Sequence, residues 1–312
     1  MNRMLYLQRL SLLGFLVLIL TGCSPYLYKE QVATFDSGVE EASKAYKNRA
    51  QDMEKISVLS NLSVSGYPRL ILKNGCQPEE EVCPITTKTG EPLSYSELIK
   101  DSHYAVLKAL EGYSGALKEI VNAEDMTALK SANKDACEGI GEAVEAANLD
   151  PSDNYSPIVN GSCTIITKFT EVYLDEKRFR VLNHAVNQAD PEVKKLANYM
   201  AEKAKLADKF LKRNANDNLT ILLSTLPDNI DKTDDKQVKQ YEKGLTDALA
   251  IYHKNQEALN TDLATAFNQL IKAHEALVEA VNDPNSQKDA ALETVRDFYK
   301  TAKSLTQHGD EE

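Results

Sequence analysis

The sequence has no tryptophan, and it lacks the residue patterns on which common catalytic centres depend. No two histidines have the HExxH spacing that places two zinc ligands on one helix face. No CxxC pair, GxSxG motif or glycine-rich phosphate loop occurs either. The five histidines are His103, His184, His253, His274 and His308. The sequence therefore contains no recognisable reaction centre, and we expect no metal and no cofactor.

Basic residues are also in short supply. The chain has 36 Lys+Arg against 47 Asp+Glu, a net charge of −11. Residues 1–22 contain two arginines and no acidic residue, so the remainder has 34 basic residues against 47 acidic ones, a net of −13. This balance argues against binding to nucleic acid or docking of a basic face on anionic lipid. We interpret it as a solvated acidic surface, with an acidic face matched to a basic partner as the alternative.

Long apolar runs are missing except near the start of the chain. The run from Leu10 to Leu20 follows Arg3 and Arg9, and its 11 residues fall short of the roughly 20 that span a bilayer. A basic start, a short apolar core and small residues after it are typical of a secretory signal. The stretch that closes the run, Leu20-Thr21-Gly22-Cys23, resembles the lipobox of bacterial lipoproteins. An uncleaved membrane helix is the alternative interpretation.

The resemblance to lipoproteins implies a modification and a location. It implies removal of the signal peptide 1–22 and attachment of a diacylglyceryl group to Cys23, usually with acylation of the freed amine. Residues 23–28 would then form a lipidated tether. The residue directly after Cys23 is Ser24. In Gram-negative lipoproteins, an Asp at this position resembles the signal for retention in the inner membrane. We therefore expect an anchor in the outer membrane, facing the periplasm.

The four other cysteines predict two disulfides, because an exported chain usually pairs an even number of cysteines. They are Cys76, Cys83, Cys137 and Cys163. Three pairings are possible, and proximity favours Cys76 with Cys83 and Cys137 with Cys163. The second pair lies symmetrically about a turn signal at residues 149–154, so an antiparallel helix pair would bring the two cysteines level.

Apolar residues recur at helical spacing along most of the chain, which predicts an all-α fold. We expect helices at about residues 29–64, 94–120, 125–148, 156–188, 191–226, 235–282 and 286–306. The length of several suggests an elongated antiparallel bundle of coiled-coil-like helices. The bundle domain would cover residues 29–306, with a disulfide-bounded loop or ribbon at 67–92 and an acidic tail at 307–312.

Local signals predict particular boundaries and contacts. Asp190-Pro191-Glu192 is typical of a helix start, with Asp as the N-cap and Pro at the first helical position. A faint repeat pairs Gly38 with Gly244 and predicts a close helix crossing or a bend near each. We expect five tyrosines to be buried in the core: Tyr46, Tyr95, Tyr113, Tyr241 and Tyr252. We expect four others to be available for contacts: Tyr26, Tyr28, Tyr67 and Tyr155.

These features favour a non-catalytic lipoprotein that works through contact with another envelope protein, as a scaffold, spacer or assembly accessory. An alternative is an inhibitor or immunity lipoprotein whose acidic loop, Gln77-Pro78-Glu79-Glu80-Glu81, plugs the basic cleft of an enzyme. A helical envelope hydrolase is a third possibility. Deletion of the loop and assay of envelope substrates distinguish the three.

Overall fold

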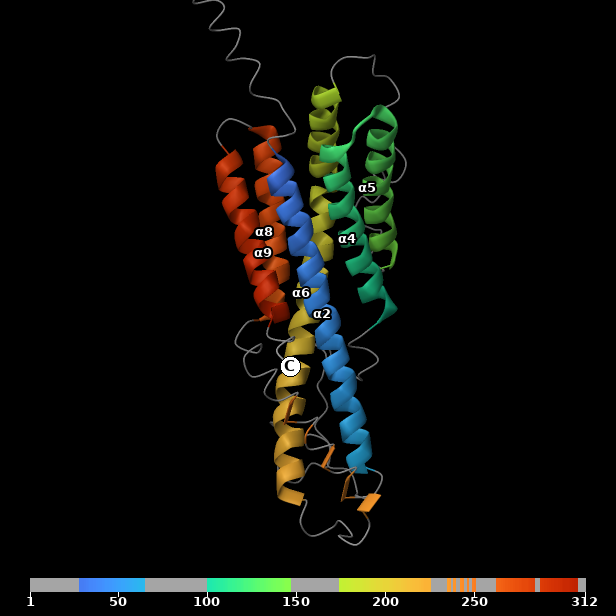
Figure 1. Ribbon diagram of the computed structural model, residues 1–312, viewed down its shortest axis with the longest axis vertical. Coiled ribbons are helices and arrows are strands. Elements are labelled where there is room, and N and C mark those ends of the chain that lie inside the picture. The colour runs from blue at the N-terminus through green and yellow to red at the C-terminus, as the bar shows by residue number, and fades with distance from the viewer. Residues whose placement is uncertain are drawn as a thin grey trace, which may run out of the picture. The chain divides into compact units, whose positions relative to one another are not determined.

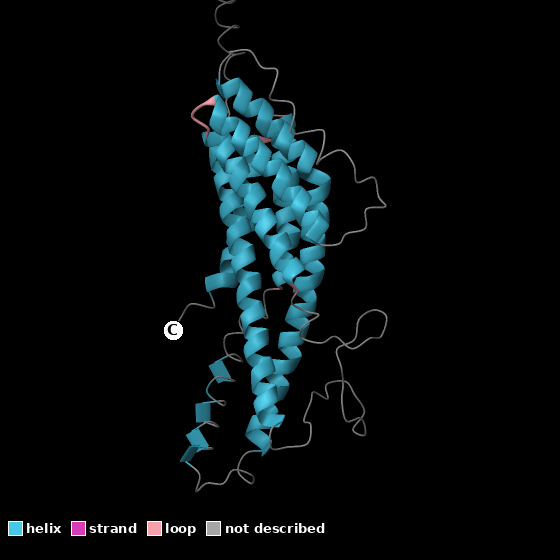
Figure 2. Cartoon of the chain, turned by 90° about the vertical axis from the view of Figure 1, so that its right-hand side faces the viewer, coloured by secondary structure: helices cyan, strands magenta, loops and turns pink. Residues whose placement is uncertain are grey.

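The computed structural model describes residues 28–64, 100–146, 174–225, 262–283 and 287–307, with isolated positions between 235 and 250. The elements of this part of the chain are all helices, and it contains no strand (Figures 1 and 2). They are α2 (Lys29–Val64), α4 (Asp101–Asn122), α5 (Met126–Ala146), α6 (Leu174–Thr225), α8 (Leu263–Asn282) and α9 (Lys288–Gln307). The prediction of an all-α fold is confirmed.

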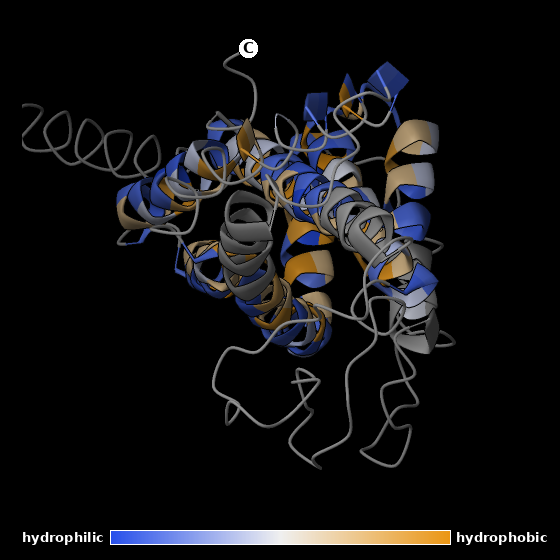
Figure 3. Cartoon of the chain, turned by 90° about the horizontal axis from the view of Figure 1, so that it is seen from below, coloured by the Kyte–Doolittle hydropathy of each residue, from blue (hydrophilic) through white to orange (hydrophobic). Residues whose placement is uncertain are grey.

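The apolar stripes read from the sequence form the core. In α2 the following apolar residues, which recur at helical spacing, are buried: Val32, Phe35, Val39, Ala42, Tyr46 and Met53. The same holds in α9 for Ala291, Val295, Phe298, Ala302 and Leu305. Figure 3 shows apolar and polar residues mixed along the helices. Residues three or four apart share one helix face, so burial of that face is what holds these helices in place.

The chain divides into two compact units. Unit 1 comprises Met1–Val39, Ala105–Ala197 and Gln269–Tyr299, and unit 2 comprises Glu40–Tyr104, Asn198–Asn268 and Lys300–Glu312. Each unit therefore takes segments of helices that are distant in the sequence.

Contacts within unit 1 give the directions of its helices. The hydroxyl of Tyr28 donates to the carbonyl of Ala280 at 3.0 Å, and the ring of Phe35 lies 5.9 Å from that of His274. As the residue number rises along α2, the residue number of its contact on α8 falls. The helix α8 therefore runs antiparallel to α2 in this unit. The antiparallel arrangement of the predicted bundle is therefore present between these two helices.

The predicted helix start at Asp190 is wrong, because α6 runs through Pro191 without ending. Proline cannot donate the hydrogen bond that Asn187 would otherwise accept, and such a loss usually kinks or ends a helix. Burial on both sides of the proline outweighs it here: Val186, Val193 and Leu196 are all buried. The carboxylate of Asp190 makes side-chain contacts with another helix instead of capping α6.

The predicted unbroken helix from about 235 to 282 is also wrong, because α8 begins at Leu263. Asp262 is not helical, and its carboxylate accepts a hydrogen bond from the amide of Ala264 at 2.9 Å. Asp is a favoured N-cap because its side chain satisfies an amide that the first helical turn leaves unpaired. The apolar spacing continues across this break, so periodicity alone conceals it.

Other predictions have mixed outcomes. The start of α5 is confirmed, since the carboxylate of Asp125 accepts from the amides of Thr127 and Ala128 at 2.7 and 2.8 Å. In contrast, α4 begins at Asp101, later than the predicted start near residue 94, and Lys100 is not helical.

The tyrosine predictions can be checked at three positions. Tyr46 and Tyr113 are buried, as predicted for core residues. Tyr28, which we expected to be available for contacts, is fully buried, so that prediction is wrong. Its ring stacks on Phe179 with centroids 5.8 Å apart.

Several predictions concern residues outside the described part of the chain. They are the lipidated Cys23, the loop at 67–92, Cys76, Cys83, Cys163 and the side chain of Cys137. The two disulfides and the elongated shape therefore stay predictions. None of the described helices combines the length and the apolar character needed to cross a bilayer.

Candidate functional site

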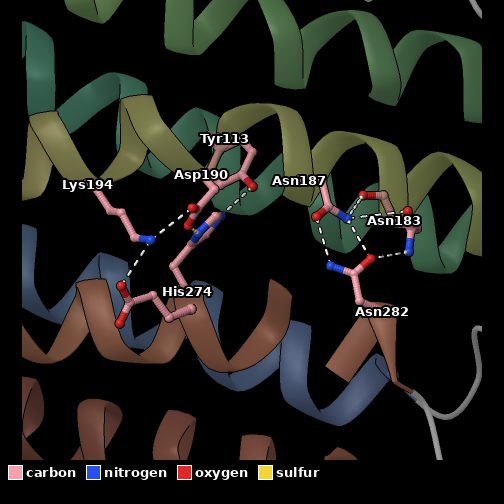
Figure 4. A network of polar contacts seen from close by, with 8 residues as sticks. Tyr113, Asn183, Asn187, Asp190, Lys194, His274 and Asn282 are labelled. Carbon is pink, nitrogen blue, oxygen red and sulfur yellow. Dashed lines mark hydrogen bonds and ion pairs between the residues drawn. The ribbon is translucent and has the colours of Figure 1, made fainter. Parts of the chain in front are cut away.

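A chain of polar side chains connects three helices inside unit 1 (Figure 4). The hydroxyl of Tyr113 on α4 lies 2.8 Å from Nε2 of His274 on α8. The other ring nitrogen, Nδ1, lies 3.1 Å from a carboxylate oxygen of Asp190 on α6. Tyr113 and His274 are 1% and 0% exposed. The three residues form a Tyr–His–Asp cluster sealed between packed helices.

The charge states in this cluster follow from its contacts. The hydrogen bond from His274 and that from Lys194 hold the pKa of Asp190 below its ordinary value, against an opposing effect of burial. Burial lowers the pKa of His274 in spite of the nearby Asp190 carboxylate. An ionised carboxylate only accepts, so Nδ1 of a neutral His274 carries the proton and donates to Asp190. Nε2 then accepts from the Tyr113 hydroxyl.

The cluster reaches the surface through Lys194. Its ammonium group lies 2.9 Å from carboxylate oxygens of both Asp190 and Glu275. These two hydrogen bonds raise the pKa of Lys194 above its ordinary value. The side chains of Lys194 and Glu275 are 34% and 45% exposed, so this end of the network is in water. The network therefore has a solvated ion pair, Lys194 with Glu275, at one end and the neutral, buried His274 further inside.

A second polar group lies further along the same helix pair (Figure 4). The Asn183 amide donates to the carbonyl of Val281 at 2.7 Å, and the Asn282 amide donates to Oδ1 of Asn187 at 2.9 Å. Asn187 also donates to Asn282 Oδ1 at 3.2 Å. These amides satisfy one another and supply a partner for a carbonyl in the last turn of α8, where the helix itself offers none.

One sequence spacing explains both polar groups. Asn183, Asn187, Asp190 and Lys194 follow one another at steps of four, three and four residues, so they share one face of α6. That face contacts α8, next to the apolar stripe that includes Val186 and Val193. The apolar periodicity of the sequence does not reveal this row of polar residues. Polar residues at the same helical spacing do reveal it.

Unit 2 contains a second buried tyrosine and histidine in contact. The hydroxyl of Tyr46 lies 2.8 Å from Nδ1 of His103, which also accepts from the amide of Lys100 at 3.4 Å. Phe267 and Tyr199 meet these rings edge to face, at 6.4 Å from Tyr46 and 5.7 Å from His103. Burial raises the pKa of Tyr46 well above its ordinary value, so its hydroxyl stays protonated and donates.

Unit 2 also holds a buried ion pair. Nε of Arg49 on α2 lies 3.1 Å from Oδ1 of Asp208 on α6, and both side chains are less than a tenth exposed. The other oxygen of Asp208 accepts from the amide of Leu263 at 2.8 Å, at the first residue of α8. Burial raises the pKa of Asp208 to about 6, although Arg49 opposes the shift. This carboxylate joins three helix segments.

The Tyr113–His274–Asp190 cluster has the order of donors and acceptors found in catalytic triads, where a hydroxyl, an imidazole and a carboxylate are hydrogen-bonded in series. A nucleophile must also meet its substrate, and the Tyr113 hydroxyl lies in the helix core. In the described part of the chain, no three His, Cys, Asp or Glu side chains are grouped so as to hold a metal ion. The contacts of this cluster hold α4, α6 and α8 together.

The sequence identifies Tyr46 and Tyr113 as core residues but does not pair them with His103 and His274. The partners are 57 and 161 positions apart, so no local pattern connects them. The acidic side chains of Asp190 and Asp208 are likewise indistinguishable in sequence from solvated ones. The chain matches no protein-family model, no curated protein and no solved structure.

Proposed function

We propose that this protein is a lipid-anchored envelope protein that acts without catalysis, through contact with another envelope protein as a scaffold, spacer or assembly accessory. The observation that carries the proposal is the sequence Leu20-Thr21-Gly22-Cys23 behind a short apolar run and two arginines. Cys23 is the lipid-bearing residue, and Ser24 directs the protein to the periplasmic side of the outer membrane.

The described helices support a role in contact rather than in chemistry. Their one triad-like cluster, in unit 1, is closed to substrate. Long helices held by buried side chains present extended polar faces, which suit a protein that spaces or aligns others. Two or three acyl chains would hold such a protein stably at a bilayer, whereas one gives only marginal binding.

The anchor is tested on protein extracted from its native host. Intact-mass measurement of the amino-terminal peptide is expected to show residues 1–22 removed and a diacylglyceryl group on Cys23. The Cys23→Ser variant is expected to keep its leader and to lose the lipid mass. An unmodified thiol at Cys23 in the wild-type protein would contradict the anchor.

Location in the outer membrane is tested separately with Ser24→Asp. This change leaves Cys23 and the bundle in place, so the lipid should still be attached. The variant is expected to fractionate with the inner membrane, while the wild type fractionates with the outer membrane. Equal distribution of the two proteins would contradict the role given to Ser24.

The contact function is tested by crosslinking in living cells, followed by mass spectrometry of captured proteins. We expect one envelope protein to be enriched with the wild type and lost with Cys23→Ser, since the unanchored chain no longer reaches the membrane. Turnover of an envelope substrate by purified protein, abolished by single substitutions in one cleft, would contradict a non-catalytic role.

The acidic loop between Cys76 and Cys83 favours a second candidate, an inhibitor or immunity lipoprotein. Its three consecutive glutamates match the basic cleft of an enzyme that attacks the envelope. Deletion of residues 77–82 should remove protection against such an enzyme and leave the lipid anchor intact. Unchanged protection would exclude this candidate.

A further inference from the structure

The first described residue of the chain is fixed to the rest of unit 1. The Tyr28 hydroxyl donates to the carbonyl of Ala280, and its ring stacks on Phe179. One turn later the Gln31 amide donates to the carbonyl of Lys288 at 3.3 Å. The start of the described chain is therefore held by α6 and α8 at residue 28 and by α9 at residue 31.

Only five peptide units separate this fixed point from Cys23. At no more than about 3.6 Å each, they reach at most about 18 Å, whatever conformation they adopt. The head-group layer of a bilayer leaflet takes up roughly 5–8 Å of that distance. The part of unit 1 around Tyr28 then lies within about one helix diameter of the head groups.

The residues near Tyr28 define one end of unit 1. α8 finishes there at Asn282, and α9 starts there at Lys288. Asn183, which contacts Val281 and Asn282, places α6 at the same end. We call this end of unit 1, where Asn183, Asn187, Asn282 and Lys288 surround the buried Tyr28, the Tyr28 end.

The chemistry of the Tyr28 end suits contact with head groups but not insertion. Two carbonyls at the end of α8 accept hydrogen bonds from Tyr28 and Asn183, and the side-chain amides here are uncharged. Nearby Asp283 and Asp289 are acidic and Lys288 is basic, so this end offers no basic face to attract anionic lipid. Among the described residues the only exposed large hydrophobic side chain is Tyr104, which belongs to unit 2.

We propose that the Tyr28 end of unit 1 faces the bilayer and rests on its lipid head groups, held there by the short lipidated tether. This inference rests on the anchor proposed above. It orients unit 1, with α8 descending towards the membrane along its sequence and α9 rising from it. A partner protein must then meet the protein elsewhere than at the Tyr28 end.

The absence of tryptophan allows a direct test with single-tryptophan reporters. Asp289→Trp and Asp297→Trp remove the same charge from exposed positions of α9, separated by eight residues or about 12 Å of helix. The lipidated full-length variants are placed in vesicles of phosphatidylethanolamine and phosphatidylglycerol that contain a lipid with a nitroxide head group. We expect several-fold stronger fluorescence quenching for Asp289→Trp than for Asp297→Trp.

A second pair on α8 guards against local effects of either substitution. Glu279→Trp and Lys272→Trp are both at exposed positions, and α8 runs opposite to α9. The stronger quenching should therefore appear at the higher residue number on α8 and at the lower one on α9. Equal quenching within both pairs, or the reverse order, in protein whose Cys23 carries the lipid mass would overturn the orientation and leave the anchor standing.

The tether itself is tested by lengthening it. Insertion of about 20 Gly and Ser residues after Ser24 adds a mean reach of roughly 25 Å and leaves Tyr28 in place. The difference within each reporter pair should then disappear. A difference that survives the insertion would overturn the role of the short tether. Absence of lipid on Cys23 in the parent protein is a separate outcome, in which the proposed anchor fails together with this orientation.

Discussion

The ring of Phe298 on α9 lies directly against the backbone of Gly38 on α2. A Cβ atom at position 38 would come within 2.5 Å of Cε1 and 2.7 Å of Cδ1 of that ring. Phe298 is fully buried and also packs against Phe35, with ring centroids 6.0 Å apart. The close approach predicted for Gly38 is confirmed, and the ring has little room to move.

Gly38→Ala is therefore expected to destabilise the protein in spite of the higher helix propensity of alanine. Crowding of a packed core typically lowers the free energy of unfolding by about 1–3 kcal/mol. Urea unfolding of the full chain measures the change. Gly112→Ala is the matched control, because nothing lies within 4 Å of a Cβ at that exposed position of α4. It should stabilise by roughly 0.5–1 kcal/mol.

Shortening the opposing ring provides a check on the cause. The double variant Gly38→Ala/Phe298→Leu should lose less stability than the sum of its two single changes, because residues in contact do not act additively. Strict additivity would show that the alanine acts elsewhere than on Phe298.

Tyr28→Phe tests the capping of α8. The carbonyl of Ala280 would pair with the amide of residue 284 in a continuing helix, but residue 284 is proline and has no N–H. The Tyr28 hydroxyl takes that role, and its loss leaves a buried carbonyl unsatisfied. We expect a decrease of about 1–2 kcal/mol in the free energy of unfolding.

The same substitution at an exposed tyrosine serves as the control for Tyr28→Phe. Tyr104 is 36% exposed, so Tyr104→Phe should change stability by less than about 0.5 kcal/mol. Similar effects at the two positions would contradict the capping role of Tyr28.

How far the sequence predicts this fold depends on the range of the interactions involved. The stripes of α2 and α9 are periodic, so both helices could be placed from sequence. The continuity through Pro191 could not, because packing decides it. The break at Asp262 has a local cap, but the apolar spacing that continues across it conceals the cap. Asp208 meets the amide of Leu263 at that break, and burial of Val193 holds the helix past the proline.

The polar clusters show the same limit. The sequence reveals which residues can ionise, but their environment comes from helices that are distant in the chain. His274 is neutral because α2, α4 and α6 cover it, and the pKa of Asp208 is raised because the carboxyl is buried, although Arg49 opposes the shift. Neither surrounding is encoded within a few residues of the group concerned.

His274→Gln tests the electrostatics of the unit 1 cluster. Burial lowers the pKa of His274, so the unfolded chain binds more protons below about pH 6.5 than the folded one. Wild-type stability should therefore fall as the pH drops through this range. A glutamine amide can donate to Asp190 and accept from Tyr113 without titrating.

Urea unfolding at a series of pH values measures this effect as the wild-type free energy of unfolding minus that of the variant. The difference should shrink as the pH falls from about 7 to 5, since only the wild type has the titrating group at this position. His184→Gln removes one histidine from α6 outside the cluster and is the matched control. A difference that is constant or grows in acid would exclude a buried neutral His274.

Asp208→Asn is expected to reveal the opposite dependence on pH in unit 2. Burial raises the pKa of Asp208 from 3.8 to about 6, so the folded protein binds more protons than the unfolded chain between these values. Stability from this group is greatest below about pH 4 and is lost as the pH rises through 6, by an amount on the order of 3 kcal/mol. Asparagine keeps an oxygen for the amide of Leu263 but does not titrate.

The wild-type free energy of unfolding minus that of Asp208→Asn should therefore decrease between about pH 4 and pH 7. Asp135→Asn on the exposed face of α5 supplies the control. An increase over the same range would mean that the attraction of Arg49 outweighs burial at this carboxylate.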